Sequence, residues 1–162
     1  MKETVLSFRP FTQQDALTVA SWRYPGPYAL YDLDPRNCDV LAALLQPDYR
    51  YHTILREDEV IGFLCLGKDG RVPGWHYDDS ALDLGMGLRP DLTGQGQGPI
   101  CLAAVISFIL RQHTAATLRT TVAGWNQRAL RLCLNTGFRE VGRFNSTRNE
   151  QTEYVVLVRE SK

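Results

Sequence analysis

The residues best suited to chemistry lie in a glycine-rich turn, Thr93 to Gly98, which joins an apolar strand to an apolar helix. Glycines at alternate positions permit backbone conformations with positive φ that other residues disfavour. Such a turn exposes backbone N–H groups beside the positive end of a helix dipole, which suits an anionic phosphate group. The turn matches neither a Walker A loop nor the dinucleotide fingerprint. It therefore predicts a phosphate site of another kind.

The strand before this turn, residues 81–88, has two different faces. One face carries Leu82, Leu84, Met86 and Leu88, and the other carries one carboxylate, Asp83, and two glycines. The glycine face could leave room for a ligand to approach the backbone. The structural alternative is a pair of glycines at a bulge in a twisted strand.

A loop rich in aromatic residues follows the first predicted helix. Two prolines and a glycine between Tyr24 and Leu33 enforce the loop, which also carries Tyr28 and Tyr31. The rings could pin the loop to the core, or the hydroxyl groups could line a binding pocket. The sequence does not decide between a loop packed on the core and a loop that lines a pocket.

The composition describes an ordinary globular protein, and the 162 residues predict a single domain over 1–162. A formal net charge of zero gives no reason to expect nucleic acid or an acidic membrane as a partner. No apolar run approaches the ~20 residues of a membrane span. The four cysteines form no C-x-x-C pair. We therefore expect free thiols, no metal site and, with no signal peptide visible, a cytoplasmic protein.

Hydrophobic periodicity predicts elements in the order β-α-α-β-β-β-α-β-α-β-β, a mixed sheet with helices on its faces. Thr12 is expected to cap the first helix, and Asp34 the second. The polar segment from Gly67 to Ser80 is expected to be a loop at the sheet edge. The predicted strands are 4–10, 51–56, 60–66, 81–88, 118–122, 138–144 and 152–159, and the predicted helices are 13–22, 34–45, 99–109 and 126–135.

Two motifs together resemble the GNAT family of N-acetyltransferases. The segment from Leu88 to Gly98 is similar to that family's loop for the pyrophosphate of acetyl-CoA. The segment from Val122 to Phe138, with Asn126 and Cys133, is similar to its second signature. The order of elements matches over essentially the whole chain, and the sequence looks closest to the branch that includes ribosomal-protein N-terminal alanine acetyltransferases.

The resemblance implies an α/β (α+β) fold. Its sheet would be mixed and mostly antiparallel, with about seven strands splayed at the cofactor slot and about four helices on its faces. It also implies acetyl transfer from acetyl-CoA to a primary amine, either a small amine or a protein or peptide N-terminus, by direct attack in a ternary complex. A CoA-binding module with little or no turnover is the alternative. A monomer and a homodimer are both compatible with the exposed final strands.

Roles for individual residues follow from the same resemblance. Asp83 would be the general base, and an ordinary ion pair with an arginine is the alternative for this carboxylate. His52 and His76 are other candidates for the base. Cys133 stands where many members have a tyrosine that protonates the departing CoA thiolate, and a buried core thiol is the alternative. Tyr24, Tyr28 and Tyr31 would frame the acceptor. The implied cofactor-binding residues are Met86, Leu88, Thr93, Gly94, Gln95, Gly96, Gln97, Gly98 and Asn126.

Three positions qualify these roles. Thr93 stands where the family usually has Arg or Gln, so a side-chain contact near the phosphates is missing. Pro99 removes one N–H donor just after the loop. Asn126 is also a good helix N-cap whatever the protein binds.

Overall fold

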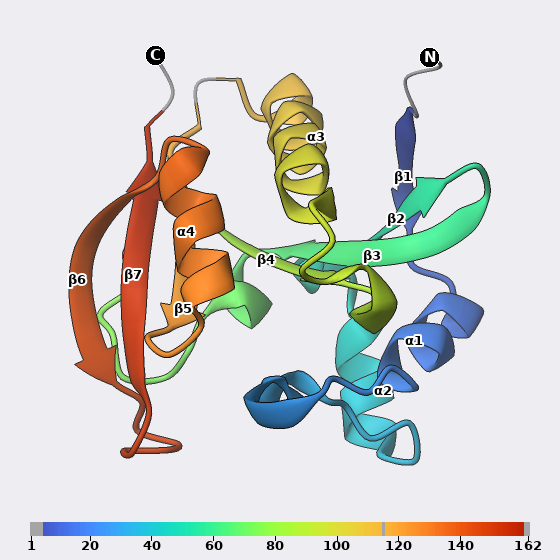
Figure 1. The fold of residues 1–162 in the computed structure, drawn as a ribbon, viewed down its shortest axis with the longest axis horizontal. Helices are drawn as coiled ribbons and strands as arrows, with labels where there is room; N and C mark the ends of the chain where they lie inside the picture. Colours follow the sequence, from blue (N-terminus) through green and yellow to red (C-terminus); the bar gives the residue numbers. More distant parts are fainter. Residues whose placement is uncertain (1–4, 115, 161–162) are drawn as a thin grey trace. The chain divides into compact units, whose positions relative to one another are not determined.

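A computed structural model describes residues 5–114 and 116–160, which contain four α-helices and seven β-strands in the predicted order (Figure 1). The chain divides into two compact units. Unit 1 comprises residues 1–65 and 86–97, and unit 2 comprises residues 66–85 and 98–162. The strand before the glycine-rich turn contributes to both units, and a single domain over 1–162 stays a prediction.

The bounds of the elements differ from the predicted ones by a few residues. The strands are β1 (Leu6–Pro10), β2 (His52–Arg56), β3 (Glu59–Leu66), β4 (Leu82–Leu88), β5 (Leu118–Ala123), β6 (Arg139–Asn145) and β7 (Glu153–Arg159). The α-helices are α1 (Gln13–Ala20), α2 (Cys38–Leu44), α3 (Gln97–Gln112) and α4 (Gln127–Asn135). Short 3-10 helices are η1 (Gly26–Tyr31), η2 (Pro47–Tyr49), η3 (Lys68–Gly70) and η4 (Pro90–Leu92).

Hydrogen bonds from capping side chains set the helix starts. Thr12 forms a capping box with Asp15 at the start of α1, as predicted. The predicted start of α2 at Asp34 is wrong. The Asp34 carboxylate accepts the backbone N–H of Arg36 in a local turn, and Asn37 caps the helix instead.

The strands pair in the order β1-β2-β3-β4-β5-β7-β6. The β1–β2, β2–β3, β5–β7 and β6–β7 pairs are antiparallel, and β4–β5 is parallel. The predicted fold class, a mixed and mostly antiparallel sheet with helices, is confirmed.

In unit 1, the space beside the β4 backbone is filled. A side-chain carbon added at Gly87 would overlap the ring of Phe63 on β3. Phe63 also contacts Phe11, Trp22 and Tyr51, which form an aromatic cluster around it. The hypothesis that this glycine leaves room for a ligand is therefore wrong for Gly87, because an aromatic ring occupies the space.

In unit 2, the parallel pairing of β4 with β5 is short. It consists of Leu82 opposite Leu118 and Asp83 opposite Arg119. At the next residue, the Leu84 carbonyl accepts the Thr120 hydroxyl at 2.9 Å, so a side chain replaces the backbone partner. The splay of the strands at the cofactor slot stays a prediction.

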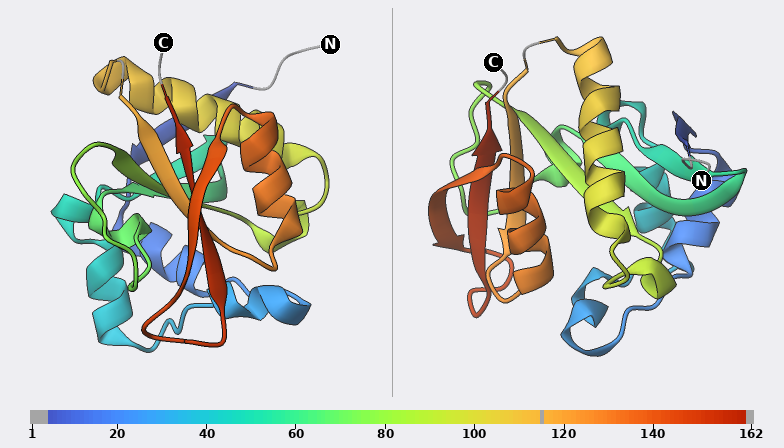
Figure 2. Two further views of the ribbon diagram at one scale, coloured as in Figure 1. Left: turned by 90° about the vertical axis from the view of Figure 1, so that its left-hand side faces the viewer. Right: turned by 45° about the horizontal axis from the view of Figure 1, so that its top comes forward.

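The segment 67–80 covers a face of the unit 2 sheet, on the side opposite α4 (Figure 2). Gly70 lies so close to β4 that an added Cβ would be 3.2 Å from the backbone N of Gly85. Trp75 packs on Phe144 with ring centroids 5.6 Å apart. The segment is a loop, as predicted, and it packs on the edge strand β6 through Trp75 and Phe144. The contacts of Gly70 extend it over the sheet as far as β4.

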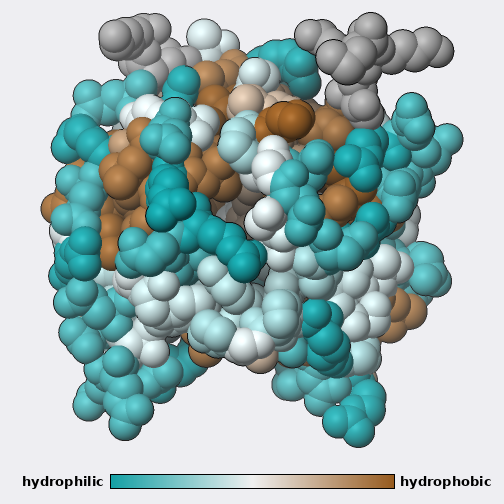
Figure 3. Space-filling view, in the orientation of Figure 1, coloured by the Kyte–Doolittle hydropathy of each residue, from teal (hydrophilic) through white to brown (hydrophobic). Residues whose placement is uncertain are grey.

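A hollow of about 290 Å³ lies between α4 and the β6–β7 hairpin of unit 2. Leu130, Leu134 and Leu157 supply its apolar lining, and Leu134 is 55% exposed. Apolar surface is visible over α4 and the start of β6 at the upper left of Figure 3. None of the predicted site residues lines this hollow, so it is not a candidate for the phosphate site.

The contact between Gly87 and Phe63 gives a stability prediction. Gly87→Ala should lower the free energy of unfolding by about 1–3 kcal/mol, because the new methyl group forces the ring or the strand to shift. Urea unfolding at equilibrium measures the change. In a Phe63→Ala background the same substitution should cost much less, and an equal cost in both backgrounds would contradict the explanation.

Candidate functional site

The glycine-rich turn after β4 belongs to unit 1 as far as Gln97, which is also the first residue of α3. Gly94 and Gly96 have φ values of 70° and 78°, a left-handed conformation that favours glycine. Within the described residues, the backbone N–H groups of Gly94, Gln95 and Gly96 have no hydrogen-bond partner. All three residues are exposed, so these donors are available to an anion.

The side chains before the turn fix its position on the β2–β3 hairpin of unit 1. Arg89 donates to Glu59 and to Asp91, each at 2.6 Å, and its backbone N–H donates to the carbonyl of Ile61. Hydrogen bonding to Asp91 raises the pKa of Arg89. The Thr93 hydroxyl donates to the Pro90 carbonyl at 2.7 Å. Thr93 therefore stabilises the 3-10 turn η4.

Tyr24 connects the aromatic loop to β4 within unit 1. Its hydroxyl donates to the Leu88 carbonyl at 2.6 Å, and burial raises the pKa of this hydroxyl. Its backbone N–H donates to the Asp32 carboxylate. Tyr28 is half-buried and Tyr31 is exposed, both in η1. The structure thus brings Tyr24 to the predicted cofactor strand and leaves the other two tyrosines along the loop.

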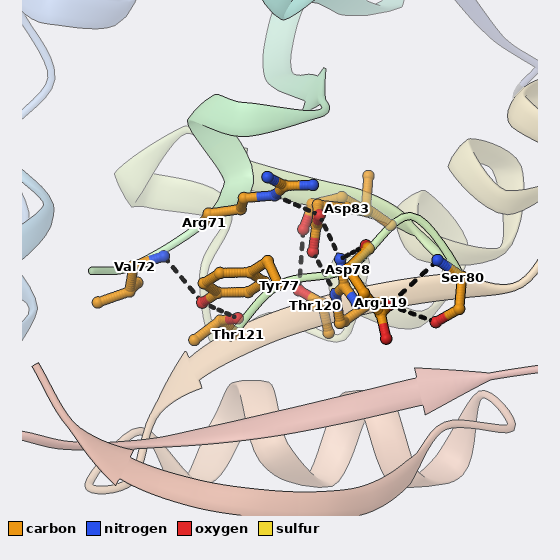
Figure 4. A network of polar contacts seen from close by, with 10 residues as sticks. Arg71, Val72, Tyr77, Asp78, Ser80, Asp83, Arg119, Thr120 and Thr121 are labelled. Atoms are coloured by element: carbon orange, nitrogen blue, oxygen red, sulfur yellow. Dashed lines mark hydrogen bonds and ion pairs between the residues drawn. The ribbon is translucent and has the colours of Figure 1, made fainter. Parts of the chain in front are cut away.

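Asp83 is the centre of a buried polar network in unit 2 (Figure 4). Its side chain is 1% exposed. Arg119 donates to both of its carboxylate oxygens, at 2.7 and 2.8 Å, and Arg71 donates from Nε at 2.8 Å. Arg119 also donates to the carboxylate and the carbonyl of Asp78.

Tyr77 holds the two arginines of this network. Both guanidinium groups lie over its ring, at 5.3 Å for Arg71 and 5.1 Å for Arg119. Its hydroxyl accepts the backbone N–H of Val72 and is hydrogen-bonded to the Thr121 hydroxyl at 2.9 Å. The network therefore joins the segment 67–80 to both β4 and β5.

This geometry favours the ion-pair alternative for Asp83. A general base must reach the proton that it removes. The Asp83 carboxylate is instead buried and occupied by three N–H donors from two guanidinium groups. Hydrogen bonding to Asp83 also raises the pKa of Arg119, so this guanidinium group stays charged. A base role for Asp83 stays an untested prediction that this arrangement disfavours.

The remaining predicted residues of unit 2 lie at helix starts and in the core. The Asn126 side chain accepts the backbone N–H of Ala129 at 3.1 Å, which makes it the N-cap of α4. A Cβ at Gly98 would lie 3.2 Å from Leu132, so the small residue permits close packing of α3 on α4. Cys133 is 7% exposed, and burial raises the pKa of its thiol to about 12.

The sequence predicted neither arginine of the Asp83 network. One signal was available for Arg119, since it is the one charged residue in the predicted strand 118–122. A charge inside such a strand indicates a buried partner. Nothing in the sequence around Arg71 indicates its role, because its contact with Asp83 depends on how the segment 67–80 folds over the sheet.

Other site classes find no support among residues 5–114 and 116–160. No group of His, Cys, Asp or Glu in this part of the chain could hold a metal ion. Here no helix has both the length and the apolar character to cross a membrane. The four cysteines form no disulfide: Cys38 is exposed, and Cys65, Cys101 and Cys133 are buried.

Comparison with known proteins places this geometry in context. The family model described as "Acetyltransferase (GNAT) domain" matches residues 6–139. No curated protein sequence matches the chain. The solved structure of AAC(6')-Ib in complex with ribostamycin and coenzyme A is similar, with 17% identity, coverage of 96% of this chain and 93% of that chain, and a TM-score of 0.73.

A second similar structure is a chimera of the spermidine N-acetyltransferase SpeG from Vibrio cholerae and hSSAT. It has 14% identity, coverage of 96% of this chain and 95% of that chain, and a TM-score of 0.70. At such identities these likenesses show the fold.

The Asp83 network gives a second stability prediction. Asp83→Asn should lower the free energy of unfolding by about 3–5 kcal/mol, because it leaves two guanidinium groups without their buried partner. Chemical denaturation measures the loss. The matched control is Asp79→Asn in the neighbouring segment 67–80, where the exposed side chain should contribute less than about 0.5 kcal/mol. Equal effects of the two substitutions would show that the network is not a main source of stability.

Proposed function

Because the chain belongs to the GNAT acetyltransferase family, we propose that it transfers an acetyl group from acetyl-CoA to a primary amine. The observation that carries this proposal is the exposed turn at Gly94 to Gly96, whose N–H groups have no partner within the described residues. The turn lies inside the segment that the family model matches. A structure of AAC(6')-Ib with acetyl-CoA bound adds support for this cosubstrate.

The chain's own residues suggest how acetyl-CoA would be held. N–H groups from Gln95 to Gly98 would donate to the diphosphate, at the positive end of the α3 dipole. Met86 and Leu88 would pair with the amides of the pantetheine arm, and Asn126 would contact that arm from the start of α4. The Tyr24 hydroxyl would keep Leu88 in place through its hydrogen bond to the carbonyl.

For the acceptor, we propose a small-molecule amine. The similar solved structures include an aminoglycoside acetyltransferase and a spermidine N-acetyltransferase, and both kinds of compound carry amines. Tyr24, Tyr28 and Tyr31 would frame the acceptor with aromatic faces and hydroxyl groups. A protein or peptide N-terminus is the alternative acceptor, and it differs in needing an extended groove.

The proposed reaction is direct attack. The neutral amine nitrogen attacks the thioester carbonyl and the carbon–sulfur bond breaks. The nitrogen loses one proton as the amide forms, and the CoA thiolate takes up one proton. Orientation of the two substrates supplies most of the acceleration in such a ternary complex. Asp83 would act at a distance from the reacting atoms, by holding β4 and β5 together through Arg119.

Cys133 is a poor candidate for the proton donor. Burial raises the pKa of its thiol to about 12, whereas an ordinary thiol has a pKa of about 8.5. Proton transfer from Cys133 to a CoA thiolate would therefore run uphill. We propose that Cys133 is a core residue of α4. The thiolate would then take its proton from another source, either the attacking nitrogen, which must lose one as the amide forms, or water.

A CoA-binding module with little turnover is the second candidate. The observation that favours it is the state of the two predicted catalytic groups, since Asp83 is buried in ion pairs and Cys133 is buried with a raised pKa. The two candidates share the cofactor and differ only in whether an acceptor is acetylated.

We also propose a cytoplasmic monomer. Free thiols at four positions fit a reducing compartment. The β6 strand forms the open edge of unit 2, where it pairs with β7. Charged residues at Arg139, Glu140 and Arg143 and a register shift in β6 oppose pairing with a second copy. A homodimer through another surface is the alternative.

Ligand-induced stabilisation tests the cofactor. Acetyl-CoA and CoA at 100 times their Kd should raise the unfolding free energy by about 2.7 kcal/mol, seen as a higher melting temperature, and ATP should not. Thiol release is then measured with spermidine, aminoglycosides and peptides with free N-termini. Stabilisation by ATP but not by CoA would refute the proposal. Stabilisation by CoA without acetylation of any acceptor would favour the binding module.

The pH dependence of turnover tests Cys133. With a pKa of about 12 the thiol stays protonated through the accessible range, so it contributes no inflection between pH 6 and pH 10. Cys133→Ala should therefore leave the shape of the kcat profile unchanged and change kcat by less than about threefold. Its main effect should be a stability loss of about 1 kcal/mol from the small cavity. A lost inflection on the alkaline side would restore Cys133 as the acid.

A further inference from the structure

The glycine-rich turn has no cation of its own. Its side chains are a threonine and two glutamines among glycines, and the Thr93 hydroxyl is used by the Pro90 carbonyl. The nearby Arg89 guanidinium is neutralised by two carboxylates, those of Glu59 and Asp91. A diphosphate at this turn would carry negative charge that the turn itself does not balance.

Arg56 at the end of β2 is a second guanidinium beside the turn. Its Nη1 donates to the Gln97 side-chain oxygen at 3.4 Å, a long and therefore weak hydrogen bond. In the described part of the chain Arg56 has no ion pair with a carboxylate. Its charge also acts on the turn from close by, since hydrogen bonding from Arg89 and, more weakly, the Arg56 charge lower the pKa of Asp91.

The hydrogen bond to Gln97 places the Arg56 guanidinium beside the first residue of α3. Gln97 is the first residue of α3, where unpaired N–H groups and the helix dipole favour an anion. Arg56 is half-buried, so its charge is less screened than that of a fully exposed arginine. A guanidinium can exchange a weak bond to an amide oxygen for charge-assisted bonds to phosphate oxygens.

The charges around the hairpin add weight to this arginine. The turn after Arg56 carries Glu57, Asp58 and Glu59, and Asp91 follows β4. Arg89 forms ion pairs with two of these four carboxylates, those of Glu59 and Asp91. Without Arg56, the charged side chains of this hairpin turn and of η4 would be predominantly acidic, which disfavours binding of a phosphate.

We propose that Arg56 binds the diphosphate of the CoA cosubstrate and so replaces, from the β2–β3 hairpin, the cation that the turn lacks at Thr93. This inference rests on the proposed function. Arg56 is then a cofactor-binding residue contributed by unit 1 from a position 41 residues before Gln97 in sequence.

Calorimetric titration of the full chain with CoA and with dephospho-CoA, which lacks the 3′-phosphate, tests the proposal. Arg56→Ala should weaken both ligands by about tenfold, the value of one charge-assisted hydrogen bond. Arg56→Lys should lose less affinity for both ligands, because lysine keeps the positive charge. Arg36→Ala is the matched control, since Arg36 is an exposed arginine of unit 1 paired with Asp34, and it should leave both affinities unchanged. The gap between wild type and Arg56→Ala should narrow at 0.5 M salt.

The outcomes separate this inference from the proposed function. Wild-type protein that fails to bind CoA refutes the proposed function. If the wild-type protein and Arg56→Ala bind CoA with equal affinity, the Arg56 assignment is overturned and the proposed function is not. If Arg56→Ala weakens the binding of CoA but not of dephospho-CoA, Arg56 binds the 3′-phosphate, and the diphosphate assignment is also overturned. If Arg56→Ala melts below the titration temperature, Arg56→Gln gives the same comparison, because it keeps the length of the side chain without its charge.

Discussion

The bidentate ion pair between Asp83 and Arg119 is the constraint on which unit 2 depends. It lies at the second and last residue pair of the parallel β4–β5 ladder. A buried carboxylate is tolerated only when its charge and its hydrogen-bonding capacity are satisfied. Arg119, Arg71 and the Tyr77 ring supply that satisfaction together. The same contacts hold the segment 67–80 over the sheet. The Asp83 network therefore stabilises both the β4–β5 pair and the packing of this segment on it.

Beyond this ion pair the two strands stop pairing by their backbones, and the Thr120 hydroxyl takes the place of a ladder bond at Leu84. The start of β4, in unit 2, is therefore stabilised by an ion pair, and its end, in unit 1, is stabilised by other contacts. There the Tyr24 hydroxyl and the Phe63 ring fix Leu88 and Gly87. The glycine-rich turn follows this end directly. Its conformation is anchored by Arg89 on the hairpin, while its own N–H groups stay available.

Local sequence patterns predicted the order of the strands and helices, the Thr12 and Asn126 caps and the glycine-rich turn, because each depends on residues a few positions apart. The same reasoning failed where two local signals competed. Asp34 and Asn37 can both cap a helix, and only the turn that Asp34 forms with Arg36 decides between them. It failed also for Gly87, because an empty glycine face and one covered by an aromatic ring look the same in sequence.

The sequence by itself determined the family, because two motifs resembled it and the family model matches residues 6–139. Tertiary structure alone decided which side chains meet. It paired Asp83 with Arg119 and Arg71, buried Cys133 and brought Arg56 beside Gln97. The physical reason is that the electrostatic environment of a side chain depends on distance and burial in space. The residues that set this environment lie 12, 36 and 41 positions apart in the chain, beyond the reach of any local pattern.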